Sequence, residues 1–434
     1  MTRPADASVT LDILEIGARG DGIAEHEGRR YFVPFTLPGE TVEAEPCGER
    51  RPGRGEGIAA DLVEILAPSR HRESPPCAHF KVCGGCALQH WRRDAYTAWK
   101  VALITRALAQ RGVDAPRFEP PLVGAPGERR RADFVLHRQG KRVLAGFHER
   151  MSPRIVDVGV CVVVRPTLGA LLEPLRTALV SILPDGSAID AVVNETDSGI
   201  DLLLRPHKRL DLSLERREAL VALAERADLA RLSWGDRASA EPVVVRRPPL
   251  LLFGEARVEP PPGTFLQATK RAEQAMRAVV AEWAGDASRL ADLFAGVGAL
   301  SIGRPGKVAL FESDKPTVAA AEAAARRLGG RVTVERRDLF RNPLTAAELN
   351  GFDAVLLDPP RAGAAAQSAE LAHSKVARLV YASCDPGSFA RDALSLQEGG
   401  YRLEKLLPID QFLWSAHVEL IALFARAPLR SAKT

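Results

Sequence analysis

The chain has 434 residues, of which 46% are hydrophobic and 26% charged, and its formal net charge is +4. This length allows several domains with substantial cores, and the composition is that of an ordinary soluble protein. No apolar run approaches the length of a membrane-spanning helix. The segment from Met1 to Asp6 lacks the apolar stretch of a signal peptide. We therefore expect a cytoplasmic protein that makes no use of a membrane.

Charge is distributed unevenly along the chain. Residues 1–66 carry 7 Arg against 13 Asp and Glu, a net charge of −6. Residues 67–160 carry 17 Arg and Lys against 8 acidic residues, a net charge of +9. A basic central region of this kind suggests a surface that binds a polyanion. An arginine-rich solvated surface explains the charge equally well.

The first part of the chain, from Val9 to Leu66, alternates short β-type runs with turn signals such as Gly20-Asp-Gly22 and Leu37-Pro-Gly39. This pattern predicts a small β-barrel. The sequence of residues 20–24 and of Tyr31–Glu40 resembles that of a TRAM domain, an OB-like module that binds RNA. We assign residues 6–66 to this module.

Three cysteines follow with the spacing Cys77-x5-Cys83-Gly-Gly-Cys86, and a fourth, Cys161, lies far downstream. Six cysteines in such a chain are too few for a disulfide scaffold, and their clustering favours metal or cluster ligation. Thiolates brought together bind zinc or an iron–sulfur cluster. The spacing alone leaves zinc, a cluster and unrelated buried thiols open.

The central region combines a helix with short strands. Trp91–Gly112 is rich in Ala and Leu and ends at a glycine, which predicts a helix. Residues 120–262 contain short strands, including Ala132–His137. The three adjacent arginines Arg129 to Arg131 precede that strand, and we expect them to contact phosphates.

From Phe265 onward, predicted helices alternate with apolar strands, which indicates a doubly wound, mostly parallel sheet. Such sheets bind ligands at the carboxyl ends of their strands, so residues at those ends are the candidates for a site. They are Phe294 with the turn Gly296-Val-Gly298, Glu312, Asp338, Asp358 and Cys384.

The glycine turn followed by an acid on the next strand fits a nucleotide cofactor. A dinucleotide fold would have a third glycine where this chain has Ser301. S-adenosylmethionine has no pyrophosphate and needs only close backbone approach at Gly296 and Gly298. Glu312 would accept both ribose hydroxyls, and Asp338 would lie near the adenine amine. The sequence therefore predicts S-adenosylmethionine as the cofactor.

Cys384 ends a short apolar run that is broken by Asp385-Pro386. A lone cysteine is more often a buried structural thiol, and a Gly-x-Gly turn alone is weak evidence. With Asp358-Pro-Pro and His417-Val-Glu419, however, these features form an ordered set. The set resembles the catalytic domain of the RNA 5-methyluridine methyltransferase family, whose nucleophile motif is Ser-Cys-Asn-Pro where this chain has Ser383-Cys384-Asp385-Pro386.

The resemblance extends from about Val9 to Phe424 and implies a multidomain α/β protein. Its parts would be the OB-like TRAM barrel, a central α+β domain with an iron–sulfur cluster (67–92 and 120–262) and a Rossmann-like class I methyltransferase domain (93–119 and 263–430). The implied ligands of a 4Fe-4S cluster are Cys77, Cys83, Cys86 and Cys161. The implied S-adenosylmethionine-binding residues are Gln267, Phe294, Glu312, Asp338 and Asp358.

In the chemistry that the family implies, a thiolate adds to C6 of uracil, which makes C5 nucleophilic. C5 takes a methyl group from the sulfonium, and a base then removes the C5 proton so that the thiol leaves. Cys384 is the predicted nucleophile and Glu419 the predicted base, while Asp358 would hold the uracil edge. We expect a monomer that acts on RNA. The TRAM module and cluster point to large-subunit rRNA, with tRNA as the alternative.

Several positions depart from the family pattern: Asp385, Ala299, a shortened segment 299–307, and Phe412-Leu-Trp-Ser415 in place of Phe-Pro-x-Thr. They give weight to a non-catalytic RNA-binding or ribosome-assembly factor. An amino-methyltransferase would have an aromatic residue where Arg361 stands, and a cytosine-5 enzyme would place its cysteine after a proline.

Overall fold

The computed structural model describes residues 8–49, 56–237 and 239–426, so the predicted domain limits at residues 6 and 430 lie outside it. The chain divides into two compact units. The first unit runs to Leu103 and also contains His148–Val156 and Phe412–His417, and the second contains Ile104–Phe147, Asp157–Gln411 and the chain from Val418 on. The three-domain division stays a prediction. Within the described ranges, none of the helices has both the length and the apolar character needed to cross a membrane.

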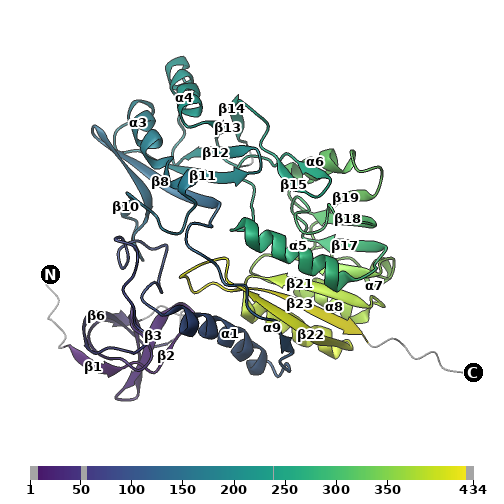
Figure 1. Cartoon of the computed structure of the whole chain (residues 1–434), viewed down its shortest axis with the longest axis horizontal. Coiled ribbons are helices and arrows are strands. Elements are labelled where there is room, and N and C mark those ends of the chain that lie inside the picture. The colour runs from purple at the N-terminus through teal and green to yellow at the C-terminus, as the bar shows by residue number, and fades with distance from the viewer. Residues whose placement is uncertain (1–7, 50–55, 238, 427–434) are drawn as a thin grey trace, which may run out of the picture. The chain divides into compact units, whose positions relative to one another are not determined.

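The first unit is built on a sheet of six strands, drawn in purple in Figure 1, in the order β1-β5-β6-β4-β3-β2. Only the β4–β6 pairing is parallel among the pairings that are described. Buried side chains such as Leu11, Val33, Val42 and Ala44 form its core, so the predicted β-region is confirmed as a sheet. The strands are β1 (Val9–Asp12), β2 (Glu15–Ile16), β3 (Asp21–His26), β4 (Arg29–Pro34), β5 (Thr41–Glu49) and β6 (Ile58–Ala67).

The second unit contains a largely antiparallel sheet in the order β9-β8-β11-β12-β13-β14. The helices α3 and α4 belong to this region, and α4 begins at the N-cap Ser213. The elements of this region are β8 (Arg131–Gln139), β9 (Arg142–His148), α2 (Pro166–Gly169), α3 (Leu172–Ile182), β11 (Ala188–Thr196), β12 (Gly199–Pro206), α4 (Leu214–Arg226), β13 (Leu229–Trp234) and β14 (Glu241–Val245). The short strand β10 (Ile155–Asp157) lies at the boundary of the two units, with Ile155 and Val156 in the first.

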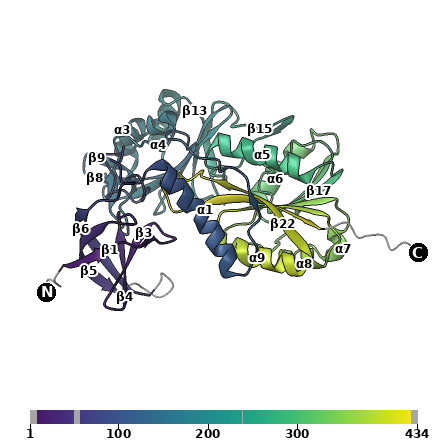
Figure 2. The same ribbon diagram turned by 60° about the horizontal axis from the view of Figure 1, so that its bottom comes forward.

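The second unit also contains the predicted doubly wound sheet, with eight strands in the order β19-β18-β17-β20-β21-β23-β22-β7. The five strands from β19 to β21 are parallel, and β23 runs antiparallel to β21. Figure 2 shows α5 and α6 on one face of this sheet and α8 and α9 on the other. The strands are β7 (Arg117–Phe118), β17 (Arg289–Leu293), β18 (Lys307–Glu312), β19 (Val332–Arg336), β20 (Ala354–Leu357), β21 (Arg378–Ser383), β22 (Tyr401–Ile409) and β23 (Glu419–Arg426).

Apolar side chains on both faces bury the sheet. Met276, Val280 and Trp283 of α5 pack on one face, and Phe389 of α9 packs on the other. Ile104 and Leu108, from the second half of α1, belong to the same core as Phe389. The helices are α1 (Arg93–Gln110), α5 (Lys270–Ala284), α6 (Lys315–Ala325), α7 (Ala346–Leu349), α8 (Ala365–His373) and α9 (Pro386–Glu398).

The connection from β17 to β18 consists of turns, with no helix among its described residues. The absence of a helix there agrees with a short connection, and the shortening of segment 299–307 relative to the family stays a prediction. A hairpin of β15 (Leu251–Phe253) and β16 (Ala256–Val258) lies against this connection. A Cβ at Gly303 would lie 1.7 Å from the carbonyl oxygen of Phe253, so the two backbones meet where only glycine fits.

Candidate active site

Three predicted site residues follow neighbouring parallel strands and meet at one edge of the sheet. Phe294 follows β17, Asp358 follows β20, and Cys384 follows β21. The register pairs Leu293 with Leu357 and Leu357 with Tyr381, so the ends of the three strands are level. The carboxyl edge of a parallel sheet is where such folds bind ligands.

Glu419 reaches the same edge from the opposite direction. It is the first residue of β23, and this strand pairs Leu420 with Ser383, the residue before Cys384. Its side chain is buried, and its Oε2 accepts a hydrogen bond of 2.8 Å from Nε2 of Gln411. The antiparallel strand therefore brings the predicted base next to the strand that carries the predicted nucleophile.

A chain of hydrogen bonds joins Glu419 to a predicted cofactor residue. Nε2 of Gln411 also donates to Oε1 of Gln267 over 2.7 Å, and Nε2 of Gln267 lies 3.5 Å from Oδ2 of Asp358. Sequence reasoning found Gln267, Asp358 and Glu419 but missed Gln411. The only signal for Gln411 in the sequence is its place two residues after the apolar end of β22, and its burial is seen only in the structure.

The acidic groups of this site share a poorly solvated environment. Burial raises the pKa of Asp358 to about 7, and burial followed by the charge of Asp358 raises the pKa of Glu419 to about 8. Burial, and then the charges of Glu419 and Asp358, raise the pKa of the Cys384 thiol to about 11. The positive charge of Arg361 acts in the opposite direction on Glu419 and Cys384. Without ligands, therefore, the thiol is protonated at neutral pH.

Asp385 caps the helix that follows the nucleophile. Its Oδ1 accepts a hydrogen bond of 2.8 Å from the backbone N–H of Ser388, at the start of α9. Pro386 occupies the first turn, where its missing N–H costs nothing. Asn and Asp are equally good N-cap residues. This departure from the family motif therefore keeps the local hydrogen bonding.

The loop that carries Asp358 and Arg361 is clamped onto α9. Oδ2 of the buried Asp392 accepts hydrogen bonds from the backbone N–H of Ala364 and from the hydroxyl of Tyr381. Gly363 has a φ of +74°, and a Cβ there would lie 2.6 Å from Asp392 Oδ2. The loop and the helix after Cys384 are thus held together by one carboxylate.

Except for Gln267 and Asp358, the predicted cofactor residues lie along the ends of β17, β18 and β19. Oε2 of Glu312 accepts a hydrogen bond of 3.0 Å from the backbone N–H of Gly296, and its Oε1 accepts from Ser313 and Asp314. Asp338 is exposed beyond β19. These contacts fix the carboxylate of Glu312 beside the glycine turn.

Three further observations test whether the turn fits a nucleoside cofactor. A Cβ at Gly296 would meet no atom within 4 Å, so the backbone there borders open space. Asp292 is buried, its Oδ1 has no hydrogen-bond partner, and burial raises its pKa to about 8. Phe294 has a φ of +62° and contacts the half-exposed ring of Phe340 at 5.2 Å between centroids. A polar, partly aromatic cradle of this kind suits an adenosine group.

A family model described as tRNA (Uracil-5-)-methyltransferase matches residues 318–427, which include Asp358, Cys384 and Glu419. An uncharacterized RNA methyltransferase of Brucella suis biovar 1 is 43% identical over 420 residues, which cover 96% of this chain and 97% of that protein. This chain belongs to the RNA (uracil-5-)-methyltransferase family. It is an enzyme that uses S-adenosylmethionine to methylate uracil C5 in RNA.

Other relatives of this methyltransferase agree with the assignment. The 23S rRNA (uracil(1939)-C(5))-methyltransferase RlmD of Shewanella sediminis is 29% identical over 434 residues, which cover 98% of this chain and 97% of that protein. The crystal structure of Pyrococcus abyssi tRNA (uracil-54, C5)-methyltransferase with S-adenosyl-L-homocysteine has a TM-score of 0.72 at 22% identity, covering 96% of this chain and 99% of that one. The latter likeness shows the shared fold.

The structure of the methyltransferase does not confirm the cluster. Among the described residues, no group of three or more His, Cys, Asp or Glu side chains is placed to hold a metal ion. Cys77, Cys83 and Cys86 lie in the first unit and Cys161 lies in the second, and all four are half-buried. The loop itself is ordered, since Gly84 N donates to His148 O over 2.9 Å.

The altered segment Phe412–Ser415 belongs to the first unit. Lys100, buried on α1, donates from Nζ to the carbonyl oxygens of Phe412 and His417, and the carbonyl oxygen of Trp414 accepts from the backbone of Ala87 and Leu88. The main chain of this segment is therefore fixed without the usual proline.

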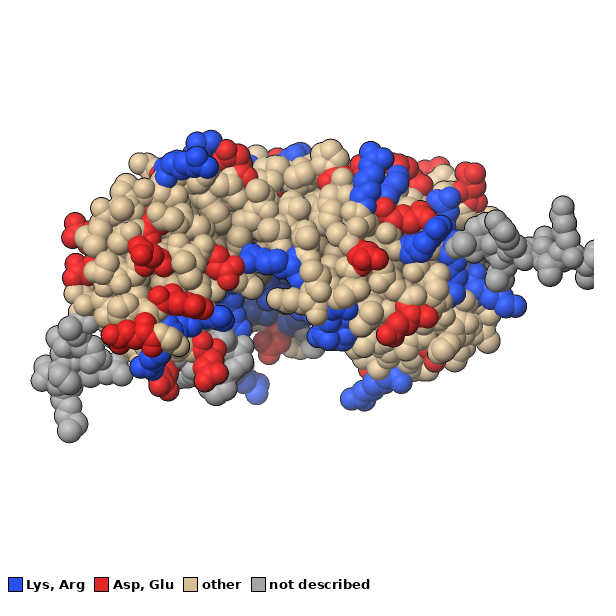
Figure 3. Space-filling model, turned by 90° about the horizontal axis from the view of Figure 1, so that it is seen from below, with Lys and Arg blue, Asp and Glu red and all other residues tan. Residues whose placement is uncertain are grey.

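The prediction of phosphate contacts is wrong for Arg130. Its side chain is buried, forms an ion pair with the buried Glu273, and donates from Nε to the carbonyl oxygen of Gln267 over 3.1 Å. Arg131 lies over the ring of Phe265 at 5.1 Å. On the face in Figure 3, basic side chains occur in separate groups with acidic ones between them.

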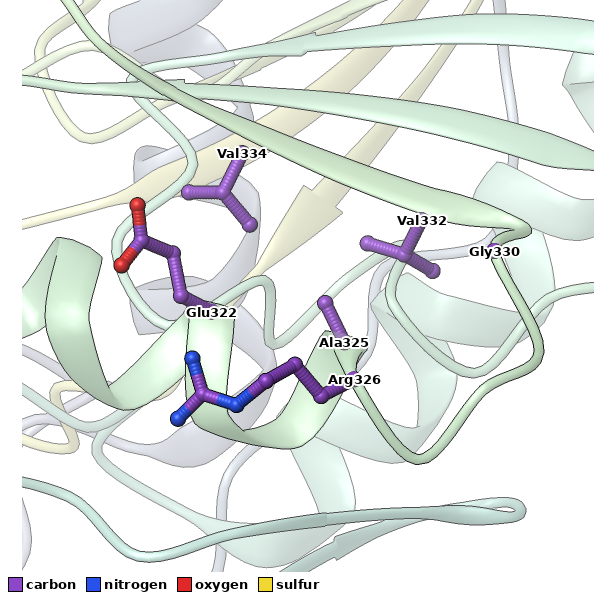
Figure 4. Close-up of a pocket in the computed structure, with 6 residues that line it drawn as sticks. All are labelled: Glu322, Ala325, Arg326, Gly330, Val332 and Val334. Atoms are coloured by element: carbon purple, nitrogen blue, oxygen red, sulfur yellow. The ribbon is translucent and has the colours of Figure 1, made fainter.

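A shallow pocket of about 270 Å³ lies between α6 and β19. In Figure 4, Val332 and Val334 of the strand face Ala325 of the helix, with Glu322 and Arg326 beside them. None of the predicted catalytic or cofactor residues lines it, so it is separate from the active site.

Proposed function

We propose that this methyltransferase modifies C5 of a specific uridine in large-subunit rRNA through a covalent bond between Cys384 and C6 of the base. The observation that carries the proposal is the convergence of Cys384, Glu419 and Asp358 at one edge of the sheet. A thiol beside a buried carboxylate with a pKa near 8 suits addition at C6 followed by proton removal at C5.

Sγ of Cys384, after losing its proton, forms a bond to C6, and the electron pair of the C5–C6 double bond becomes available at C5. C5 bonds to the methyl carbon of S-adenosylmethionine as the carbon–sulfur bond of the sulfonium breaks. The carboxylate of Glu419 takes the proton from C5, the double bond re-forms, and the C6–Sγ bond breaks. The net products are methylated RNA, S-adenosylhomocysteine and one proton.

The chain's own residues position the reactants. Glu312 would accept hydrogen bonds from the ribose hydroxyls, Asp338 would contact the adenine, and Gly296 and Gly298 would allow close approach of the backbone. Asp358 follows β20, which lies between β17 and β21 in the sheet, and Nε2 of Gln267 is directed at it. Asp358 would hold the uracil edge. The target uridine must leave its stack or already lie in an unstacked loop.

Large-subunit rRNA is proposed because RlmD of Shewanella sediminis, which acts on 23S rRNA, matches 98% of this chain. The sheet of residues 9–67 would be the TRAM module that orients the RNA. The 4Fe-4S cluster at Cys77, Cys83, Cys86 and Cys161 remains a prediction from the family resemblance. A tRNA substrate is the second candidate, because the description of the matching family model names tRNA.

A covalent trap tests the proposal. The protein is incubated with S-adenosylmethionine and rRNA containing 5-fluorouridine, in which fluorine at C5 cannot be removed by Glu419. We expect a denaturation-resistant adduct that maps to Cys384, and sequencing of the RNA identifies the uridine. Wild-type protein that binds RNA and cofactor yet forms no adduct would contradict the mechanism. If the adduct forms with 5-fluorouridine-containing tRNA and not with rRNA, tRNA replaces rRNA as the proposed substrate.

A further inference from the structure

We propose that Gln411 is a positioning residue that holds the Glu419 carboxylate in its reactive orientation and couples it to Gln267 in the cofactor site. This inference rests on the proposed function, because it assigns a role relative to the base. Gln411 is 3% exposed and lies two residues after the end of β22, eight residues before Glu419. It makes three hydrogen bonds, which together fix its amide in one orientation.

The orientation follows from a backbone donor. The N–H of Ala268 can only donate, and it lies 2.8 Å from the oxygen Oε1 of Gln411. The nitrogen Nε2 must therefore be the atom that faces Oε2 of Glu419 at 2.8 Å and Oε1 of Gln267 at 2.7 Å. An amide nitrogen has two hydrogens, so both are used. A flipped amide would place an oxygen against a carboxylate and an N–H against an N–H.

The same constraint passes to the cofactor site. Because Oε1 of Gln267 accepts from Gln411, its Nε2 is the atom directed at Oδ2 of Asp358, 3.5 Å away. The backbone of this segment is held by Arg130, whose N–H donates to Ala268 O and whose Nε donates to Gln267 O. The amides of Gln411 and Gln267 thus link Glu419 to Asp358, each with its nitrogen and oxygen in a fixed orientation.

This order matters for a buried base. The groups that face Glu419 are Asp358, whose charge disfavours a second carboxylate, Arg361, whose charge favours it, and the Cys384 thiol. A hydrogen bond donated to the ionised form lowers the pKa of a carboxyl group. Gln411 supplies such a bond, so its loss leaves Glu419 protonated over a wider pH range. Glu419 would also lose the donor that fixes its rotamer.

The test compares Gln411→Leu with a matched control, Gln367→Leu. Gln367 is also a buried glutamine of the second unit, and it bonds twice to the backbone of Leu344, away from the catalytic residues. The measurements are the pH dependence of single-turnover methyl transfer and the fraction of enzyme covalently linked to ordinary, unfluorinated RNA. Binding of S-adenosylhomocysteine is measured alongside them.

For Gln411→Leu we expect the acidic limb of the pH profile to move up by about one unit, which is roughly a tenfold lower rate on that limb. The adduct should accumulate because proton removal at C5 is slowed, and higher pH should restore the rate. Gln367→Leu should lower thermal stability without either effect. An unchanged pH profile with no adduct, or equal effects of both variants, would overturn the proposal. Wild-type protein without methyl transfer would instead refute the proposed function.

Discussion

Substitution of Gly363 by Ala tests whether the clamp at Asp392 holds the catalytic loop. Gly363 has a φ of +74°, and a Cβ there would lie 2.6 Å from both Nη2 of Arg391 and Oδ2 of Asp392. Those two atoms belong to a network in which Asp392 accepts from Ala364 and Tyr381, and Arg391 donates to the carbonyl oxygen of Ala362. A methyl group cannot enter without separating the loop from α9.

Two costs add up at this position. A non-glycine residue in the left-handed region costs about 1–2 kcal/mol. Displacing a buried, charged hydrogen-bond acceptor costs about 1.5–3 kcal/mol more. The expected loss for Gly363→Ala is therefore about 2.5–5 kcal/mol. Gly329→Ala is the matched control, because Gly329 has a φ of +62° and a Cβ there would meet no atom within 4 Å. The control variant Gly329→Ala should therefore lose only the free energy due to backbone conformation.

Urea unfolding of the second unit's core, monitored by tryptophan fluorescence, measures the loss of unfolding free energy in each variant. The rate of methyl transfer, measured at a temperature where both variants are folded, shows whether the loop is displaced. Since the loop carries Asp358 and Arg361, the activity of Gly363→Ala should fall much further than that of Gly329→Ala. Equal free-energy losses in the two variants would show that the clamp contributes nothing beyond backbone conformation, and the reasoning would fail.

Three more outcomes are expected. Proton removal by Glu419 should speed up as pH rises through about 8, because the carboxylate form is the base and burial raises the pKa of Glu419. Glu419→Gln should abolish this pH dependence and leave the covalent adduct on ordinary RNA. Glu312→Gln should weaken S-adenosylhomocysteine binding roughly 10- to 100-fold in calorimetry, because one charged acceptor is lost; unchanged affinity would exclude Glu312 from the cofactor site. Protein purified without oxygen should contain iron and sulfide in equal amounts, and Cys86→Ser should lose them; colourless protein loaded with zinc would remove the cluster assignment.

The sequence was sufficient for features that depend on local patterns. Apolar strands followed by Asp358 and Cys384 predicted residues that meet at one edge, because parallel strands end level. The lack of a helix in segment 299–307 was also visible, since its glycines and proline cannot continue a helix. The N-cap role of Asp385 agrees with the ordinary preference of that residue.

Features that depend on contacts between distant segments were not predictable. Gln411 bonds to a residue 144 positions away, and Arg130 pairs with Glu273 across 143 positions. No local pattern distinguishes a buried arginine from its two neighbours in a run of three. The phosphate-contact prediction was therefore wrong for Arg130, whose charge is neutralised inside the protein.

The reversed direction of β23 has a consequence for how this enzyme tolerates change. Because Ile409 pairs with Glu419, the chain leaves the sheet and returns to it at adjacent positions. The nine residues between them therefore form a loop whose two ends are held together by strand pairing in the sheet. The part of this segment after Gln411 can vary in sequence and length, because pairing with β21 and β22 sets the position of Glu419. An enzyme built in this way can change the segment after Gln411, as this chain has at Leu413 and Ser415, without moving its base.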